Sequence, residues 1–296
     1  MRLPFVSLLV VLGLLGPTTP AAAESLVVCG WDEVFVLDVT TPTAPRKTWS
    51  WRAADRQELP EAYRSLFRTT DDCKPIGADR MLITASSDGA ALVDVASGKA
   101  LWWGRCGNTH SAEWLPADRI VLACSVRPET GNRLVVFDAG TPDLPRFSTE
   151  LESGHGVVWD ASRQRLWALG LRELRAYTLV DWDSDAPSLH LAARYPLPGE
   201  GGHELSAVPQ SPQLIVSATD GVWRFDRDSE RFTPDPDLHR LAHVKSAAID
   251  ERSGRLAWTQ ADEPEWWTSR IRLAHPDGTV TLPGERLYKV RWWPLR

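Results

Sequence analysis

Four of the seven histidines stand at equivalent positions in the chain, each five to seven residues before the end of a short apolar segment. These histidines are His110, His155, His203 and His243. An imidazole has an ordinary pKa near neutrality, so it can accept or donate a proton at physiological pH, and its ring nitrogens bind divalent metals. The repeated offset therefore marks candidates for general acid–base chemistry or for metal binding.

Lysines lie close to the same positions: Lys74, Lys245 and Lys289. Histidine and lysine together suit β-elimination on an acidic sugar, in which a base removes the proton beside a carboxylate and a cation neutralises that carboxylate. In this scheme His110 or His155 is the catalytic base, and His203 is its partner. Lys74 and Lys245 are the catalytic cations that neutralise the carboxylate.

Further residues near these positions are predicted to contact a ligand: Glu113, Trp159, Glu204, Tyr288 and Lys289. Alternation along a strand could instead turn Glu113 between neighbouring sheets, and Trp159 has the character of a core residue. His110, His155 and His203 also form a candidate site for one divalent metal ion, for which imidazole nitrogens suit Zn, Mn or Fe. The alternative is structural: each imidazole bonds backbone carbonyls and holds adjacent sheets together.

The elements that position these residues repeat along the chain. Pairs of short apolar segments joined by turn residues end at Asp38, Asp94, Asp138, Thr178, Asp226 and Ala274. The spacings of 56, 44, 40, 48 and 48 residues are typical of a four-stranded propeller blade. Apolar/polar alternation and Ser-Gly, Asp-Gly and Gly-Asn turns favour strands over helices. Each later pair follows another short segment, which we interpret as the innermost strand of a blade.

The first pair lacks such a preceding segment, and the C-terminal segment 288–294 supplies the missing strand. This closure removes the free sheet edges. We therefore predict an all-β fold, a single β-propeller over residues 24–296 with six four-stranded blades; a seven-bladed ring is the alternative. The polar stretch 52–72 is predicted to be a loop or one-turn helix inserted between the first two blades. The repeated histidines then surround one mouth of the central channel, the default place for a ligand site in this shape.

The first 23 residues have the features of a signal peptide: Arg2, the apolar run 3–16 and a cleavage site at Ala21–Ala23. No other apolar run approaches the ~20 residues that a membrane-spanning helix needs. We therefore expect an exported bacterial protein, secreted or periplasmic, with no membrane partner. Export would allow disulfides among the four cysteines in any of three pairings, with buried free thiols as the alternative. The cysteines are Cys29, Cys73, Cys106 and Cys124.

The composition narrows the choice of partners. The formal net charge of -6 and the pI near 5.7 argue against binding of nucleic acid through phosphate contacts. Aromatic packing between blades explains most of the 15 tryptophans. We expect a monomer whose partner is a small anionic or carbohydrate ligand.

Several strings of the chain resemble an uncharacterised bacterial family of exported β-propellers: 73–75 (CKP), 110–116 (HSAEWLP), 154–160 (GHGVVWD), 202–205 (GHEL) and 244–246 (VKS). The resemblance spans nearly the whole chain after the signal peptide and implies the fold and the site rather than an activity. Glu204 departs from the shorter Asp that the resemblance implies. The axial histidines are also similar to those of propeller-shaped oligogalacturonate lyases, in which such residues hold a divalent metal, although the ligand pattern is not matched residue by residue.

Two classes of function follow from these features. The first is a lyase or hydrolase that acts on an acidic oligosaccharide in a pocket lined by histidine and lysine. The second is a binding or scaffold propeller that recognises a small anionic ligand, a glycan or a partner protein without turnover. The chain contains no G-x-S-x-G, P-loop or G-x-G-x-x-G motif, so other hydrolase and nucleotide-binding classes find no support.

Overall fold

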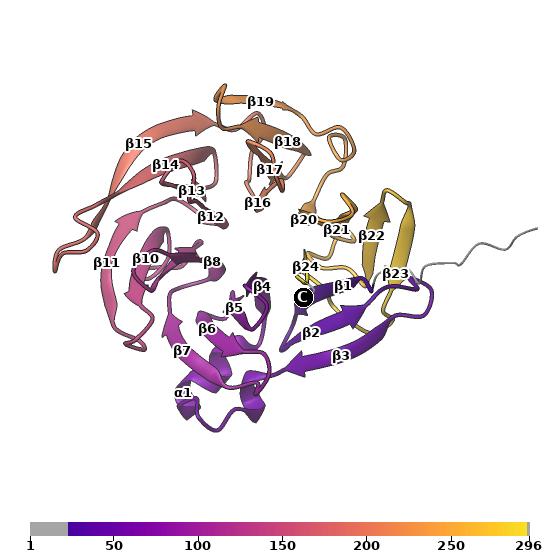
Figure 1. Cartoon of the computed structure of the whole chain (residues 1–296), viewed down its shortest axis with the longest axis horizontal. Coiled ribbons are helices and arrows are strands. Elements are labelled where there is room, and N and C mark those ends of the chain that lie inside the picture. The colour runs from indigo at the N-terminus through magenta and orange to yellow at the C-terminus, as the bar shows by residue number, and fades with distance from the viewer. Residues whose placement is uncertain (1–22, 295–296) are drawn as a thin grey trace, which may run out of the picture.

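The paired apolar segments of the sequence form β-hairpins, and the hairpins form the blades of a ring (Figure 1). The computed structural model describes residues 23–294. Over these residues, six sheets of four antiparallel strands surround a central axis. The six-bladed propeller predicted from the repeat is therefore confirmed, and the seven-bladed alternative is excluded.

Each blade begins with an inner strand at the axis and ends with an outer strand at the rim. Blade 1 contains β24 (Lys289–Trp292), β1 (Ser25–Gly30), β2 (Glu33–Asp38) and β3 (Arg46–Trp51) in this order. Blade 2 contains β4 (Thr70–Ile76), β5 (Arg80–Ala85), β6 (Gly89–Asp94) and β7 (Ala100–Arg105). Blade 3 contains β8 (Thr109–Leu115), β9 (Arg119–Cys124), β10 (Arg133–Asp138) and β11 (Pro145–Glu150).

The remaining blades follow the same plan. Blade 4 contains β12 (Gly156–Asp160), β13 (Arg165–Leu169), β14 (Glu173–Val180) and β15 (Ser188–Pro196). Blade 5 contains β16 (Glu204–Ala207), β17 (Gln213–Ala218), β18 (Gly221–Asp226) and β19 (Arg231–Pro234). Blade 6 contains β20 (Val244–Ile249), β21 (Leu256–Gln260), β22 (Arg270–Ala274) and β23 (Gly278–Thr281).

A short helical segment separates blades 1 and 2, as predicted for this polar stretch. Two 3-10 turns, η1 (Ala53–Asp55) and η2 (Ser65–Phe67), flank the single-turn helix α1 (Glu61–Arg64). Phe67 is buried and meets Trp51 edge to face, with ring centroids 5.3 Å apart. The insertion is thus anchored to the core between the two blades.

The C-terminal strand β24 closes the ring. It pairs antiparallel with β1, with Val290 opposite Val28. The backbone N–H of Val290 also donates to the Ser246 hydroxyl at 2.9 Å, a contact with β20 of blade 6. The last strand therefore joins the first blade to the last, as the unpaired first hairpin predicted.

Apolar cores lie between neighbouring blades, because successive residues of a strand point to opposite faces of its sheet. One core joins Val27 of blade 1 to Met81 of blade 2, and the next joins Leu82 of blade 2 to Leu122 of blade 3. Trp51 and Trp102 are fully buried in these cores. Packing between blades thus accounts for part of the tryptophan excess.

The cysteines adopt both of the states that the sequence allowed. Cys106 and Cys124 form a disulfide between the β7–β8 connection and the end of β9. Cys29 and Cys73 are buried free thiols. The predicted signal peptide, apart from its last residue, lies outside the described part of the chain. Within residues 23–294, no helix is long and apolar enough to cross a membrane.

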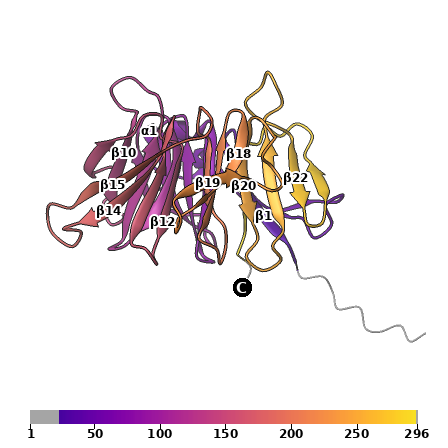
Figure 2. The ribbon, with the colours of Figure 1, turned by 90° about the horizontal axis from the view of Figure 1, so that it is seen from above.

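The strands run across the thickness of the ring, from one face to the other (Figure 2). Every blade follows the same antiparallel meander, so all six inner strands run in one direction. The residues at the start of these inner strands therefore share one face and surround one mouth of the central channel.

Candidate functional site at the mouth of the channel

The starts of the inner strands bring a cluster of polar side chains to this mouth. Asp71 lies in β4 and His110 in β8. His155 and His203 directly precede β12 and β16, and Lys245 lies in β20. The cluster is largely enclosed, since His110, His155 and Lys245 expose only 9%, 8% and 7% of their surface. Five blades thus contribute to one compact group.

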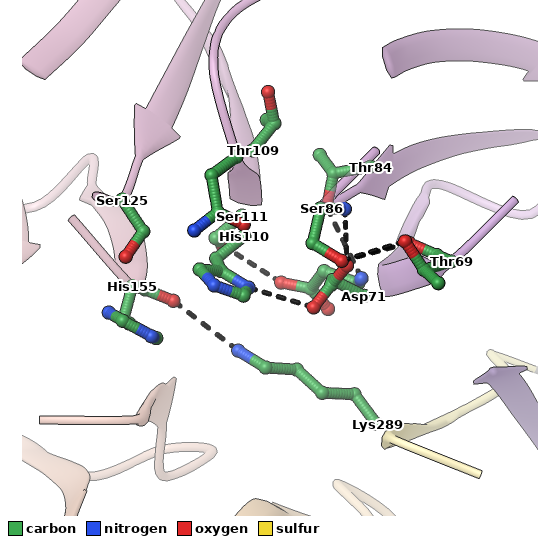
Figure 3. A network of polar contacts seen from close by, with 12 residues as sticks. Thr69, Asp71, Thr84, Ser86, Thr109, His110, Ser111, Ser125, His155 and Lys289 are labelled. Atoms are coloured by element: carbon green, nitrogen blue, oxygen red, sulfur yellow. Dashed lines mark hydrogen bonds and ion pairs between the residues drawn. The ribbon is translucent and has the colours of Figure 1, made fainter. Parts of the chain in front are cut away.

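The three central histidines of the sequence repeat contact one another through their rings. His110 and His155 stack, with centroids 4.2 Å apart and planes 16° from parallel. His155 meets His203 edge to face at 5.2 Å. Figure 3 shows His110 between Asp71 and His155. The fourth histidine of the repeat, His243, pairs instead with Glu263 at 3.1 Å.

A carboxylate orients the first histidine. Asp71 Oδ1 lies 2.8 Å from Nδ1 of His110 (Figure 3), and its other oxygen accepts the backbone N–H of Ser86. A carboxylate only accepts hydrogen bonds, so Nδ1 of His110 carries the hydrogen of this contact and Nε2 points away from Asp71. This arrangement is the one that orients a histidine for proton abstraction.

The other two histidines are held neutral. Burial lowers the pKa of His155 well below its usual range, and the neighbouring histidines add to the effect. Nδ1 of His155 donates to the carbonyl oxygen of Ser153 at 2.8 Å, so its Nε2 is also unprotonated. Burial, followed by the charge of Lys245, lowers the pKa of His203 in the same way.

Lys245 is the cation of this cluster. Its Nζ donates to Nε2 of His203 at 3.2 Å. Burial lowers the pKa of Lys245 to about 8, a shift that Glu263 opposes and Lys289 increases. Among the described residues no carboxylate lies within ion-pair distance of Lys245. A lysine without a counterion, charged at neutral pH, faces the neutral histidines.

The ring nitrogens of the three histidines do not converge on one point in this arrangement. Stacked rings present faces rather than nitrogens to each other, and Nδ1 of His110 and of His155 each donates to an oxygen. Nε2 of His203 accepts from Lys245. Within residues 23–294 no group of three or more His, Cys, Asp or Glu side chains is placed to hold a metal ion. The assignment of His110, His155 and His203 as metal ligands stays a prediction, and the structure shows these residues as a cluster of buried imidazoles.

A layer of buried ion pairs lies beneath the histidines. Glu204 and Lys289 are fully buried and 3.1 Å apart. Arg291 reaches Glu204 at 2.7 Å and Asp72 at 2.9 Å, and Ser111 donates to Asp72 at 2.8 Å. Burial opposes ionisation of Asp72, but Arg291 and the nearby lysines hold its pKa well below its usual range. Glu204 and Lys289, the two residues of this layer that were predicted to contact a ligand, form an ion pair with each other.

Lys74 and Glu113 form a further pair below this layer. Lys74 lies three residues after Asp71, which places it about 10 Å deeper along the strand. Its Nζ is 3.4 Å from Glu113 and also donates to the carbonyl oxygen of Val157. Lys74 and Glu113 therefore pair with each other, and the role of Lys74 at a substrate carboxylate stays a prediction.

Trp159 is partly buried. It packs against the apolar core between blades 3 and 4, beside residues such as Leu115 and Leu166. This packing agrees with the core character noted from the sequence, and its contact with a ligand stays a prediction.

Aromatic rings extend the site from the histidines to the rim. Tyr288 is buried, with its ring 6.0 Å from that of His110. Trp266 meets Tyr288 edge to face at 5.5 Å and stacks on Trp31 at 5.1 Å. Trp266 remains 40% exposed. A continuous series of ring contacts thus runs from solvent to the histidine cluster.

Sequence reasoning assigned no role to several members of the site. The offset shared by the histidines also leads to Asp71, but the chemistry inferred from the sequence gives this residue no part. Trp31 and Trp266 lie in turns between strands and carry no repeat signal. Arg291 belongs to the closing strand, and its partners Asp72 and Glu204 lie in other blades.

The fold and the site define a six-bladed β-propeller with a cluster of buried histidines at one mouth of its channel. By sequence, the chain belongs to a family of unknown function, DUF6528, whose profile matches residues 26–294. This match confirms the resemblance to an uncharacterised propeller family.

Other comparisons inform the fold alone. No curated protein matches the chain significantly. Among solved structures, the chain is similar to one from the crystal structure of a nidogen/laminin complex, with a TM-score of 0.60 and 14% sequence identity. The match covers 92% of this chain and 98% of that one. At this identity the likeness carries no functional conclusion.

Proposed function

We propose that the channel mouth is the active site of a lyase that cleaves an acidic oligosaccharide by β-elimination. The observation that carries the proposal is the Asp71–His110 pair, 2.8 Å apart, beside two neutral histidines and a lysine without a counterion. Titratable groups with perturbed pKa values gathered in one enclosed cluster are typical of catalytic sites.

His110 is the general base of this proposal. Asp71 fixes its tautomer, so Nε2 is free to remove the proton beside the uronate carboxylate. Asp71 also stabilises the imidazolium that forms. His155, stacked on His110 and kept neutral, adds no competing positive charge at neutral pH.

Lys245 and Tyr288 complete the reaction. The ammonium group of Lys245 neutralises the substrate carboxylate and stabilises the negative charge that develops when the proton leaves. Burial raises the pKa of Tyr288 well above its usual range, so its phenol stays protonated and can donate to the leaving glycosidic oxygen. The proton removed by His110 returns to solvent, and the sugar gains a carbon–carbon double bond as the glycosidic bond breaks.

A lyase is favoured over a glycoside hydrolase by the state of the carboxylates. Hydrolysis uses two carboxyl groups as acid and base or nucleophile. Each channel carboxylate is already bound to a cation or histidine: Asp71 to His110, Asp72 and Glu204 to Arg291, and Glu113 to Lys74.

The lyase proposal is tested with oligogalacturonate of defined length, by following the ultraviolet absorbance of the unsaturated product. Asp71→Asn and His110→Ala should each lower turnover about 100-fold or more. His190→Ala is the matched control, because this histidine is exposed on β15, outside the channel. Far-ultraviolet circular dichroism establishes that the variants fold. Equal turnover in wild type, Asp71→Asn and His110→Ala would refute the assignment.

A non-catalytic receptor is the second candidate, and the low exposure of His110 and Lys245 favours it. In a receptor the same cluster would bind a small anion or a glycan end and release it unchanged. Calorimetric binding of oligogalacturonate with no unsaturated product from the wild-type protein would support the receptor and overturn the lyase.

We also propose that the protein is exported and works as a monomer. The Cys106–Cys124 disulfide supports export, because such bonds persist in oxidising compartments. Expression of the full chain in a bacterial host should yield a mature form beginning at Glu24, seen by intact mass. A purified protein that retains residues 1–23, or that elutes as a dimer, would contradict this proposal.

A further inference from the structure

A cavity separate from the channel is lined by residues of β7 and β11, the outer strands of blades 2 and 3, and of neighbouring segments. Figure 1 shows these two strands at the rim of the ring. Its volume is about 500 Å³, within the range of small-molecule sites. The lining combines apolar groups, among them Val135 and Phe147, with the guanidinium-bearing residues Arg105 and Arg133. Apolar walls with a few polar groups are typical of ligand sites.

Arg133 is held in place without a counterion. Its Nε donates to the carbonyl oxygen of Gly131 at 3.0 Å, and one Nη donates to that of Glu129 at 2.6 Å. No carboxylate pairs with Arg133 in the part of the chain that the structure describes. An oriented guanidinium that lacks an anion is suited to a carboxylate or phosphate.

The other charges around the cavity leave this preference intact. Asp88 lines the cavity but is bound by Arg127 at 2.8 Å. Arg105 contacts Asp143 only at 3.5 Å, and Arg146 turns toward Asp138 at 3.3 Å. In a chain with a net charge of -6, this cavity is a local site of positive charge.

The walls of the cavity are tied together covalently. The disulfide joins Cys106, which lines the cavity, to Cys124 at the base of the 125–132 loop. This loop carries Thr130 of the lining, and it packs so closely on Gly107 that a Cβ there would lie 2.3 Å from the Thr130 hydroxyl. The site is therefore preformed, which lowers the cost of binding.

We propose that this cavity is a second binding site, independent of the channel mouth, for a small organic anion. Its carboxylate or phosphate binds Arg133, with Arg105 as a second cation, and its apolar body packs on Val135 and Phe147. The disulfide keeps the two walls at the distance that the ligand needs.

The proposal is tested by isothermal titration of the full chain with three probes: benzoate, phenyl phosphate and the uncharged benzyl alcohol. We expect one or both anions to bind and the alcohol to bind at least tenfold more weakly. The stronger of the two anions identifies the ligand as a carboxylate or a phosphate. Equal binding of anion and alcohol, or no binding of any probe at millimolar concentration, would overturn the proposal.

Variants separate the cavity from general surface charge. Arg133→Gln should weaken binding of the anion roughly tenfold to hundredfold, because a charged hydrogen bond is lost. Arg133→Lys keeps the positive charge but loses the two parallel N–H donors of the guanidinium, so its affinity for the anion should lie between those of the wild type and Arg133→Gln. Arg194→Gln, an exposed arginine on β15, is the matched control and should bind as wild type. Wild-type affinity in Arg133→Gln refutes the site even if the lyase proposal stands.

The disulfide supplies an independent readout. Cys106→Ser combined with Cys124→Ser should weaken binding of the anion by at least threefold while Arg133 is intact, because the walls are no longer tied. Unchanged affinity in a folded double variant would show that the disulfide does not preorganise the cavity and would overturn that part of the proposal.

Discussion

Removing the charge of Glu204 should destabilise the ring at its point of closure. Glu204 of blade 5 is fully buried and binds both Lys289 and Arg291 of the closing strand β24. In Glu204→Gln the side chain keeps its shape but loses its negative charge. Arg291 retains Asp72 at 2.9 Å, whereas Lys289, also fully buried, retains only the carbonyl oxygen of His155 at 3.4 Å. The substitution therefore leaves a buried ammonium without an anion.

The expected loss can be worked from this geometry. Breaking one partner of a buried ion pair costs about 3–5 kcal/mol, because the remaining charge stays desolvated. For a domain of this size each kcal/mol lowers Tm by roughly 2–4 °C, so the fall in Tm should be roughly 6–20 °C. Thermal unfolding followed by circular dichroism, together with urea denaturation, measures both quantities.

A surface ion pair provides the matched control. Asp38 and Arg46 are 3.1 Å apart, and Arg46 is largely exposed. Asp38→Asn should change the free energy of unfolding by no more than about 1 kcal/mol. In Glu204→Gln, the backbone amides of β24 and β1 should be the first to lose protection against hydrogen exchange. If Glu204→Gln is no less stable than Asp38→Asn, the buried pairs do not secure ring closure and the reasoning is wrong.

Three further predictions concern protons and the disulfide. The pKa of His155 is lower in the folded than in the unfolded chain, so the free energy of unfolding should fall as the pH drops below about 6.5, by up to about 1.4 kcal/mol per pH unit. His155→Phe should reduce this fall, which is measured as Tm at a series of pH values. Turnover or binding of an acidic sugar should decline above about pH 8, because Lys245 loses its proton there, and Lys245→Arg should remove that decline. A pH profile of Lys245→Arg identical to that of the wild type would contradict this role of Lys245. Replacing Cys106 and Cys124 by serine removes a crosslink between residues with a sequence separation of 18. The free energy of unfolding, measured by urea denaturation, should fall by about 3 kcal/mol. An unchanged free energy of unfolding would show that the disulfide does not stabilise the fold.

The blade architecture could be predicted because its information is local. Each hairpin carries its own alternation and turn residues, and the spacing of the hairpins sets the blade size. The closing strand could be inferred as well, because the first hairpin had no inner neighbour and the segment 288–294 had no other partner. Both inferences use only the order of short segments along the chain.

The site could be predicted only in part, for the same reason. A shared offset brings His110, His155 and His203 together, because the inner strands run in one direction around the axis. An offset does not say which charges will pair across the channel. Glu204 and Lys289 lie in strands of different blades and far apart in the sequence. No local sequence pattern predicts such a contact. Both were therefore predicted to touch a ligand, although they bind each other.

Charge pairing along the channel is the reason that we place the proposed site at the mouth. The four channel cations are Lys74, Lys245, Lys289 and Arg291, and the four carboxylates are those of Asp71, Asp72, Glu113 and Glu204. Below the mouth every cation has a carboxylate, so those layers stabilise the ring and leave no charge for a ligand. At the mouth Asp71 is bound to His110, and Lys245 has none of these carboxylates as partner. On the lyase proposal, this single unpaired cation would bind one substrate carboxylate rather than several, and we expect the protein to prefer the end of an acidic chain over its interior.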